Sequence, residues 1–591
     1  MLFVALTRSS IPQLPASGSP RQFPFAPGWL LTCATDDFLS RLSMSKDEVV
    51  VWESLLGGHV DSNHDVSLVT ACFLPALQTL QVSKSSVSGR PVYYCTNSRG
   101  EFFASTHIAW LRRAGVSIEE DKDILPELLV YRVVAPPRTL FRGIRQLRVS
   151  GSLVIDLKDG NLRISDASRG YDPPGSSASE PEEESIRRVA VALQTAVARL
   201  APVAPRVATL LSGGVDSSIL STIARDELSV RDTFSTAYPF DNPETNFEQE
   251  YALSAACELG TRHSLFVPTA TDFLTGFVEG LAAAEAPLNH LQSVLLYLLF
   301  KSALPGHMDR IICGEAADSA FGLDTHFAFR PRNDLRGRFL SLAPVHLGLR
   351  ALGSGWPRAR AMAAHMDEFR SLHLPISDPL HPIWSYAAYG DFEWVRNNYG
   401  ASREQVIASR SEQLQPVADR SFNDALALYA LNYCDVAITT TIWSKLAEEQ
   451  RKILYYPFAS QDILDTAFSI PWEIKLKTGK HIVRGAGRRL GVPDFILDRR
   501  KQSFGIASDR WAETGGAMEP LVALAAKVVD IKQLRDLQGR DPSKAMTFWS
   551  LLNYAVLIRL FVRGESKEAL LEELANRSKA SDRRVSHSLA A

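Results

Sequence analysis

The pattern of hydrophobic and polar positions divides the chain into two parts. From Trp52 to about Asp166, short runs rich in aromatic and β-branched residues are separated by turn residues, which predicts a β-rich part. Beyond about Ile186, strand-like runs alternate with stretches of helical periodicity, as in a doubly wound parallel sheet, and after Phe321 the pattern is mainly helical to about Phe561. We therefore predict an α/β protein. The predicted strands are 91–95, 101–105, 152–157, 206–211, 232–237, 263–267 and 310–313, and the predicted helices are 186–200, 216–225, 249–260 and 293–303.

The two parts are separated by residues 167–185, which are rich in Gly, Pro, Ser and Glu and therefore predict a linker. With 591 residues the chain is also too long for one hydrophobic core. We expect a first domain over 1–166, a second over 186–565, and a polar tail over 566–591 that is loose from Ser578 onward.

Composition and charge narrow the classes of partner. The chain is 46% hydrophobic and 22% charged, and its net charge of −2 supplies no general attraction to nucleic acid or to an anionic membrane. Six widely spaced cysteines without a C-x-x-C pair favour neither a zinc site nor a disulfide framework, which fits a reducing, cytoplasmic location. The apolar run near 293–300 is too short to span a membrane, and Met1 to Leu6 lacks the basic front of a signal peptide.

A glycine- and serine-rich loop lies between a predicted strand and a predicted helix. Its sequence is Leu210-Leu211-Ser212-Gly213-Gly214-Val215-Asp216-Ser217-Ser218. Glycines let successive backbone N–H groups and the helix N-terminus face one point, where they bind phosphate. Because Asp216 carries a negative charge into this nest, the loop implies a bridging Mg²⁺. The alternative is a glycine turn followed by an ordinary helix cap.

This loop resembles the S-G-G-x-D-S loop of the PP-loop ATP pyrophosphatases, which split ATP into AMP and pyrophosphate. Three later segments resemble asparagine synthetases in the same order: 313–322 (CGEAADSAFG), 477–484 (KTGKHIVR) and 499–505 (RRKQSFG). In the first part, 89–94, 102–105 and 138–144 resemble the glutaminase half of those enzymes. The resemblance covers most of the chain and implies a glutaminase-like first domain and an ATP pyrophosphatase second domain.

The resemblance also implies roles for particular residues. The cofactors would be ATP and Mg²⁺, with Asp216 and Asp318 as metal ligands, although Asp318 could instead cap a helix. Lys480 would stabilise charge at the reacting carbon, with an ordinary solvated lysine as the alternative. Glu315 would either accept a proton from the attacking amine or only fix its loop, and Arg484 would assist. The residues expected to bind the nucleotide are Leu211, Ser212, Gly213, Gly214, Asp216, Ser217, Ser218, Gly314 and Lys501.

The chain departs from the family in two places. Family glutaminases begin the mature chain with Cys, whereas this chain begins Met1-Leu2, so we expect no glutamine hydrolysis. Before the catalytic lysine, Ile453 and Tyr455 stand where the family carries Glu and Arg, which makes aspartate an unexpected substrate.

Loss of the cysteine with retention of the ATP site is the pattern of β-lactam synthetases and of lasso-peptide macrolactam cyclases. The resemblance thus implies an AMP-forming amide ligase that closes a lactam or macrolactam in a specialised pathway such as antibiotic biosynthesis. Its partners would be a small-molecule or peptide carboxylate, such as a precursor peptide together with its leader protease. Three alternatives remain open: ring closure of the β-lactam type, ammonia-dependent asparagine synthesis, and a non-catalytic scaffold.

Overall fold

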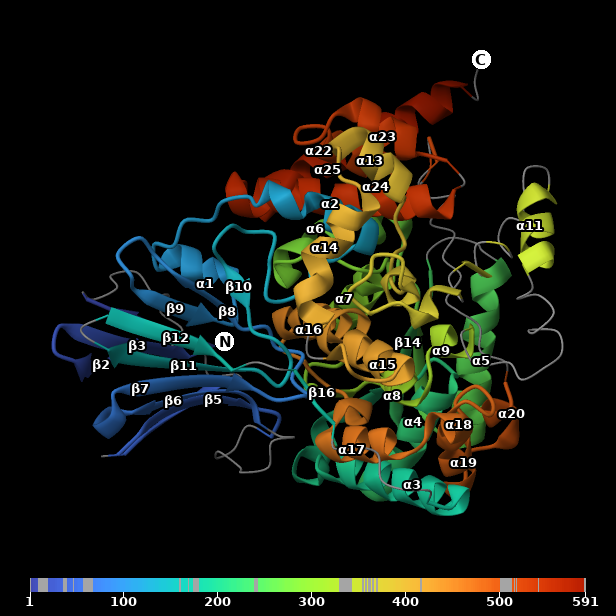
Figure 1. Ribbon diagram of the computed structural model, residues 1–591, viewed down its shortest axis with the longest axis horizontal. Coiled ribbons are helices and arrows are strands. Elements are labelled where there is room, and N and C mark those ends of the chain that lie inside the picture. The colour runs from blue at the N-terminus through green and yellow to red at the C-terminus, as the bar shows by residue number, and fades with distance from the viewer. Residues whose placement is uncertain are drawn as a thin grey trace.

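A computed structural model gives the architecture of the chain (Figure 1). A β-rich first part, blue in Figure 1, lies beside a larger part in which helices surround a parallel sheet. The mixed α/β fold with a parallel sheet is as predicted. The structure describes residues 2–8, 20–35, 40–45, 47–56, 67–158, 161–167, 170–173, 180–238, 243–328, 343–352, 356, 359, 363, 366–367, 370–414, 417–499, 513–514, 516, 518–539 and 541–588.

The first part contains two six-stranded antiparallel sheets, in the orders β10-β8-β9-β1-β3-β2 and β12-β11-β7-β6-β5-β4. Apolar side chains from both sheets form one shared cluster, so the sheets pack as a sandwich. The elements are β1 Leu2–Thr7, β2 Arg21–Ala26, β3 Trp29–Thr35, β4 Ser40–Met44, β5 Val49–Ser54, β6 Ser67–Leu74, β7 Thr79–Lys84, β8 Tyr93–Thr96, β9 Phe102–Ser105, α1 Ile108–Arg113, α2 Leu125–Tyr131, β10 Arg145–Gln146, β11 Ser152–Lys158 and β12 Asn161–Asp166.

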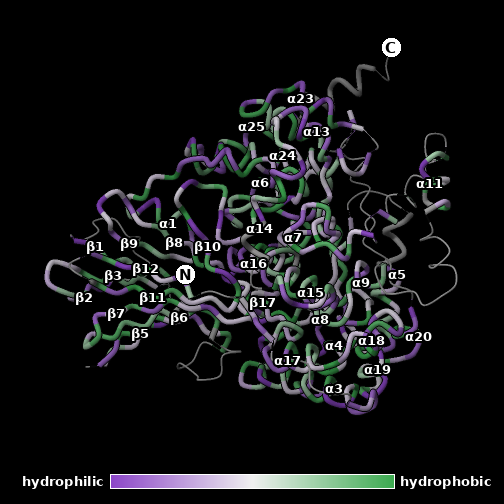
Figure 2. Tube along the Cα trace, in the orientation of Figure 1, coloured by the Kyte–Doolittle hydropathy of each residue, from purple (hydrophilic) through white to green (hydrophobic). Residues whose placement is uncertain are grey.

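Strand β1 is buried along its whole length. Leu2 and Val4 join the cluster inside the sandwich, whereas Phe3 and Ala5 point to the opposite face and join the core that continues into the second part. In Figure 2, hydrophobic stretches accordingly occur in both parts of the molecule. The two parts therefore share a continuous core, with β1 at their junction.

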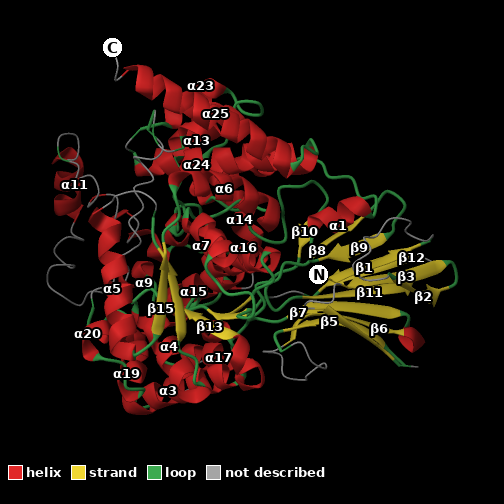
Figure 3. Ribbon diagram, turned by 180° about the vertical axis from the view of Figure 1, so that it is seen from behind, coloured by secondary structure: helices red, strands yellow, loops and turns green. Residues whose placement is uncertain are grey.

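The second part is built on a five-stranded parallel sheet in the order β15-β14-β13-β16-β17 (Figure 3). The chain winds outward from β13 to β15 and then crosses back to β16, so the order reverses between β13 and β16. Ligands of doubly wound sheets bind beyond the carboxyl ends of the strands at such a reversal. The strands are β13 Val207–Leu210, β14 Asp232–Thr236, β15 Arg262–Phe266, β16 Arg310–Ile312 and β17 Ile453–Tyr455.

Helices cover both faces of this sheet. Helices α4 and α5 lie in the connections from β13 to β14 and from β14 to β15, which run in one direction along the sheet, whereas α7 lies in the connection that returns from β15 to β16. They are α3 Glu182–Ala198, α4 Val215–Leu228, α5 Pro243–Leu259, α6 Ala270–Ala284, α7 Gln292–Ser302, α8 Ala317–Phe321, α9 Asp324–Ala328, α11 Ala343–Leu352, α13 Phe392–Tyr399, α14 Arg403–Leu414, α15 Phe422–Tyr433, α16 Asp435–Glu449, α17 Gln461–Ser469, α18 Trp472–Lys475, α19 His481–Arg489, α20 Asp494–Leu497, α22 Glu519–Ala525, α23 Ile531–Leu537, α24 Pro542–Leu557 and α25 Lys567–Ser588.

Two boundaries differ from the sequence prediction. Within the predicted linker, Tyr171 is buried, its backbone exchanges two hydrogen bonds of 2.9 Å with the Asn432 side chain, and α3 already begins at Glu182. The expected polar tail is helix α25, which buries Leu570 and Leu574 and continues through Ser578 to Ser588. In both places a few apolar residues are buried, although the sequence around them is mostly polar.

Every predicted strand and helix corresponds to an observed element, with ends shifted by up to six residues. The strand pattern before Trp52 was not predicted, although β1 to β4 lie there.

Two helical stretches, Phe422–Glu449 and Pro542–Val562, are long and apolar enough to cross a membrane, although the sequence predicted no apolar stretch of that length. Their apolar windows are 100% and 89% buried inside the protein, as in core helices.

A buried histidine joins two segments near the parallel sheet. His326 in α9 accepts a hydrogen bond from the Leu323 N–H at 2.9 Å, and its other ring nitrogen lies 2.9 Å from the Asn423 carbonyl oxygen. The ring stacks on Trp472 with a centroid distance of 4.4 Å. Burial lowers the pKa of His326 to about 3, so the imidazole stays neutral in the folded protein.

This histidine predicts a loss of stability in acid. In the unfolded chain it takes up a proton as the pH falls below about 6.5, whereas the folded protein resists protonation until about pH 3. The free energy of unfolding should therefore fall toward acid pH, by on the order of 1 kcal/mol per pH unit from this group. Urea unfolding between pH 4 and 7 should show a shallower pH dependence for His326→Gln and an unchanged one for His307→Gln at an exposed position. Equal slopes for wild type and His326→Gln would contradict this assignment.

Candidate active site

The loop after β13 turns sharply into helix α4. Gly213 has a φ of +72°, and a Cβ atom added there would lie 2.5 Å from the carbonyl carbon of Tyr251, so both the backbone conformation and the space demand glycine. Gly214 is the N-cap residue of α4 in an extended conformation. The loop therefore has the strand, turn and helix context that the sequence predicts for a phosphate nest.

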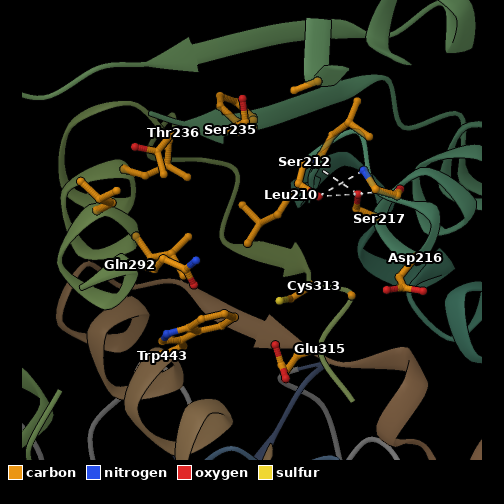
Figure 4. A pocket seen from close by; sticks show the side chains of 18 of the residues that line it. Leu210, Ser212, Asp216, Ser217, Ser235, Thr236, Gln292, Cys313, Glu315 and Trp443 are labelled. Carbon is orange, nitrogen blue, oxygen red and sulfur yellow. Dashed lines mark hydrogen bonds between the residues drawn. The ribbon is translucent and has the colours of Figure 1, made fainter. Parts of the chain in front are cut away.

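Serine hydroxyls hold this loop together. Ser217 Oγ accepts a hydrogen bond from the Ser212 N–H at 3.2 Å and lies 3.1 Å from Ser212 Oγ, as the dashed lines in Figure 4 show. Ser212 Oγ also accepts a bond from the Gly214 N–H at 3.3 Å. These small side chains fix the turn while leaving polar groups at the cavity surface.

The centre of the site is an ion cluster of three residues from three separate segments. Lys480, just before α19, places its ammonium against the Asp216 carboxylate and 2.9 Å from Asp318 Oδ1. Asp216 lies in the first turn of α4 and Asp318 in α8, after strands β13 and β16. The reversal in strand order thus brings together residues 264 positions apart in the chain.

The electrostatics of this cluster favour a charged lysine. Burial by itself would lower the pKa of Lys480, but the neighbouring Asp216 and Asp318 carboxylates raise it above its ordinary value. The side chain is only 11% exposed. Lys480 is therefore a buried ammonium whose charged form the two carboxylates favour, which argues against the alternative of an ordinary solvated lysine.

The two carboxylates also fit a magnesium ion. Mg²⁺ in proteins is commonly bound by one or two carboxylates together with substrate phosphates, and both aspartates line the cavity beside the phosphate loop. A Cβ at Gly314 would lie 3.3 Å from the Asp216 Cβ, which shows how closely the two strand ends approach. Among the residues that the structure describes, no group of three or more His, Cys, Asp or Glu side chains forms a metal cage. A cation here would therefore depend on its ligand's phosphates.

Lys480 is placed by a network of backbone and aromatic contacts. Its own φ is +56°, and Arg484 one turn later donates to the Gly479 carbonyl at 2.7 Å and to the Arg499 carbonyl at 2.9 Å. Upstream, the Lys475 ammonium lies 3.4 Å from the centre of the Trp472 ring. In this structure Arg484 thus joins two loops, and the assisting role expected for it remains a prediction.

A cavity of about 350 Å³ opens at the carboxyl ends of the strands beside this cluster. Figure 4 shows Trp443 and Gln292 on the wall across the cavity from Ser217 and Asp216, with Glu315 nearby. Most of the remaining wall is apolar. The residues expected from the sequence that line it are Leu211, Ser212, Gly214, Asp216, Ser217, Gly314, Glu315 and Asp318.

The other expected residues have different positions. Ser218 is fully buried near the start of α4, and its expected place in the nucleotide site remains a prediction. Gly213 shapes the loop without lining the cavity, and its carbonyl accepts a 3.2 Å bond from Arg499. Asp318 is not a helix N-cap, since Ala316 has that position. Lys501 lies outside the described residues.

Sequence reasoning missed Trp443, Gln292 and Arg499. Trp443 and Gln292 belong to helices α16 and α7 that carry no recognised motif, so only the tertiary fold shows that they line the cavity. Arg499 opens the 499–505 motif, and its guanidinium lies 3.8 Å from the centre of the Tyr251 ring beside the loop. Its place at the start of the motif was the available signal.

The first part lacks an activated thiol among its described cysteines. Leu2 stands at the start of β1, where its N–H donates to Thr106 Oγ1 at 3.0 Å. Burial raises the pKa of Cys33 and of Cys95 to about 12, and burial together with Glu48 raises that of Cys72 to about 11. Thiols with such pKa values are protonated and poorly nucleophilic at neutral pH.

Comparison with known proteins places this geometry in a family. The asparagine synthase family model matches residues 188–562, which is more than half of the chain. The glutamine-hydrolysing asparagine synthetase 1 of Bacillus subtilis is 23% identical over 430 residues, covering 71% of this chain and 65% of the relative. A putative asparagine synthetase of Mycobacterium tuberculosis is 26% identical over 500 residues, covering 80% and 73%.

A third relative is the carboxyethyl-arginine beta-lactam-synthase of Streptomyces clavuligerus, 28% identical over 265 residues, covering 44% of this chain and 48% of the relative. The matched family region contains α4, α8 and the N-cap of α19, which supply the three charges of the ion cluster. With the phosphate loop, that cluster and the family match in agreement, the chain belongs to the asparagine synthase family.

Proposed function

We propose that the protein is an ATP-dependent carbon–nitrogen ligase that transfers AMP to a substrate carboxylate and then lets an amine displace the AMP. The observation that carries this proposal is that Ser212, Gly214, Ser217, Asp216 and Asp318 line one cavity, beside which Lys480 pairs with both aspartates. A carboxylate resists attack by amines, so amide formation requires a leaving group on the acyl carbon. Adenylation supplies that group.

The chemistry follows from the charges in the site. Phosphoryl-type transfer depends mainly on positioning and charge neutralisation. The loop N–H groups and hydroxyls would hold the β- and γ-phosphates, while Asp216 and Asp318 would hold Mg²⁺, which screens phosphate charge when bound. Lys480 would stabilise the charge that grows on departing pyrophosphate and on the tetrahedral acyl centre. Glu315 lines the same cavity and would take the proton from the attacking amine.

The substrate we propose carries its own amine, so that the product is a lactam or macrolactam, as in a lasso peptide. Support comes from the similarity to a beta-lactam synthase and from the raised pKa values of Cys33 and Cys95 in the first part, which do not favour the thiolate that glutamine hydrolysis requires. Ile453 and Tyr455 are buried in β17, and the Tyr455 hydroxyl donates to the Ala196 carbonyl. Neither residue offers the charge expected for an aspartate site.

Beta-lactam ring closure is the second candidate, because a relative of that name matches. Ammonia-dependent asparagine synthesis is less well supported because of Ile453 and Tyr455. A non-catalytic scaffold would have no need of the buried Lys480 charge. We further propose that the enzyme is cytoplasmic and acts on a precursor peptide together with a leader protease.

Product analysis tests the proposed reaction directly. Purified protein would be incubated with Mg²⁺ and ATP, first alone and then with aspartate or with peptides bearing a free amino terminus and Asp or Glu side chains. We expect AMP and pyrophosphate in a one-to-one ratio only when a suitable carboxylate is present. Formation of ADP and orthophosphate would contradict adenylation.

Gly213→Ala should abolish ATP binding while the protein remains folded. The new Cβ would collide with the Tyr251 backbone at 2.5 Å and would force the loop out of its shape. Gly260→Ala is the matched control, because Gly260 has a similar φ of +62° but no atom within 4 Å of an added Cβ. Calorimetric titration with Mg²⁺ and ATP should detect binding to wild type and Gly260→Ala alone. Normal binding by Gly213→Ala would remove this loop from the site.

Lys480→Ala should lower kcat by at least ~10²-fold while ATP binding changes little, because the ammonium acts on charge that appears during the reaction. Lys480→Arg should not restore the rate, since a planar fork does not fit the place of a compact ammonium between two carboxylates. Pyrophosphate release would be measured beside the thermal unfolding midpoint. A rate near that of wild type, or a loss of rate matched by a collapsed midpoint, would assign Lys480 a structural role only.

A further inference from the structure

Helix α16 has two faces with different partners. One face carries Trp443, which lines the cavity and donates from Nε1 to Ser293 Oγ at 3.0 Å. Lys445 and Glu448 are two and five positions further on and therefore point to the opposite side of the helix, toward the β-rich first part. The helix thus connects the cavity wall with the first part of the molecule.

Glu448 is bound by the first part through a buried arginine. Arg90 pairs with Glu448 and also donates from Nε to Glu53 Oε2 in β5 at 2.9 Å. Arg90 is 2% exposed and Glu53 is fully buried. His107 adds a contact from Nε2 to Glu448 at 3.3 Å. Burial alone would raise the pKa of Glu448, but Arg90 and then His107 lower it well below its usual range, so the carboxylate stays charged.

Lys445 makes a second connection one turn earlier. Its ammonium lies 3.0 Å from Glu285 Oε2 and 3.4 Å from the Thr106 carbonyl oxygen. Glu285 in turn accepts hydrogen bonds of 2.9 Å from the N–H groups of Ile108 and Ala109 at the start of α1. One buried cluster thus ties α16, the end of α6 and the first helix of the β-rich part.

Close backbone packing supports these ion pairs. A Cβ atom on Gly89 would lie 2.1 Å from Ser444 Oγ and 2.4 Å from the Thr440 carbonyl oxygen, so the 88–90 segment lies directly on α16. From the side of β17, the Tyr456 hydroxyl donates to the same Thr440 carbonyl at 3.1 Å. The helix is therefore held from both sides, which leaves little freedom for the position of Trp443.

We propose that the first part of the chain, although it lacks an activated thiol, positions the cavity wall through α16, with Glu448 and Lys445 as positioning residues for the reaction. The proposal rests on the proposed function only in taking this cavity as the place of the chemistry. It assigns the β-rich part a role at this cavity, and that role does not involve glutamine. The part of the cavity wall that it positions is Trp443.

The test compares two buried carboxylates that each pair with an arginine between the two parts. Glu448→Gln removes the charge on α16. Glu127→Gln is the matched control, because Glu127 in α2 is 1% exposed and accepts from Arg410 Nε of α14 at 2.8 Å, and α14 does not line the cavity. Both variants should lower the thermal unfolding midpoint, since each leaves a buried arginine with fewer partners.

Only Glu448→Gln should change the cavity. In protein labelled with 5-fluorotryptophan, the ¹⁹F resonance of Trp443, assigned with Trp443→Phe, should shift or broaden in Glu448→Gln and remain unchanged in Glu127→Gln. At the same ATP concentration, the rate of pyrophosphate release should be at least tenfold lower in Glu448→Gln than in Glu127→Gln. Identical spectra and rates in the two variants would overturn the proposal.

The two readouts separate this proposal from the proposed function. The fluorine spectrum needs no substrate, so a protein that does not react with ATP would still report whether Glu448 positions Trp443. If Glu448→Gln does not fold, Arg90→Lys replaces it, because lysine keeps the charge but loses the fork that joins Glu53 and Glu448. An unchanged Trp443 resonance in folded Arg90→Lys would equally overturn the proposal.

Discussion

The contact of one ammonium with two carboxylates is the constraint on which the site depends. Lys480 can meet Asp216 and Asp318 only if the loops after β13 and β16 lie side by side and the start of α19 covers them. The lysine side chain is the most buried of the three, at 11% exposed against 17% for Asp216 and 35% for Asp318, so the ammonium depends on the carboxylates to offset its loss of water. The parallel sheet supplies adjacent strand ends, and α19 supplies the third charge.

The cluster also explains why the surrounding residues are small. Gly314 and Ala316 bring the segment after β16 close to Asp216, and Ala316 adopts a φ of +82° at the N-cap of α8. That conformation is costly for a residue with a Cβ and persists only where packing enforces it. The strained turn places Asp318 Oδ1 2.9 Å from the Lys480 ammonium.

Local motifs made the sheet and most of the site predictable from the sequence. The glycine loop, the 313–322 segment and the 477–484 segment each combine turn residues with charges at fixed spacing, and the structure brings them together. Ser218 lies fully buried in α4, and a motif does not show which residues of a helix are accessible. Lys501 and most of its motif fall outside the described residues.

The unpredicted features depend on contacts between residues far apart in the sequence. Arg90 and Glu448 are 358 positions apart, and nothing in either local sequence indicates a pairing. Tyr171 is a single aromatic residue in a Gly- and Pro-rich stretch, so its packing against Asn432 has no periodic signal. Strands β1 to β4 precede the segment in which a strand pattern was recognised, and α25 buries only two leucines in a polar sequence.

The continuous core through β1 has a consequence for how the chain can change over generations. Phe3 and Ala5 contribute to the core of the second part, while Leu2 and Val4 contribute to the sandwich. Deleting the first part would expose apolar surface and leave Glu448 without Arg90 and His107, so a lineage cannot simply discard the sequence of the first part. Selection would then preserve the sandwich for folding, independently of any chemistry that the first part performs.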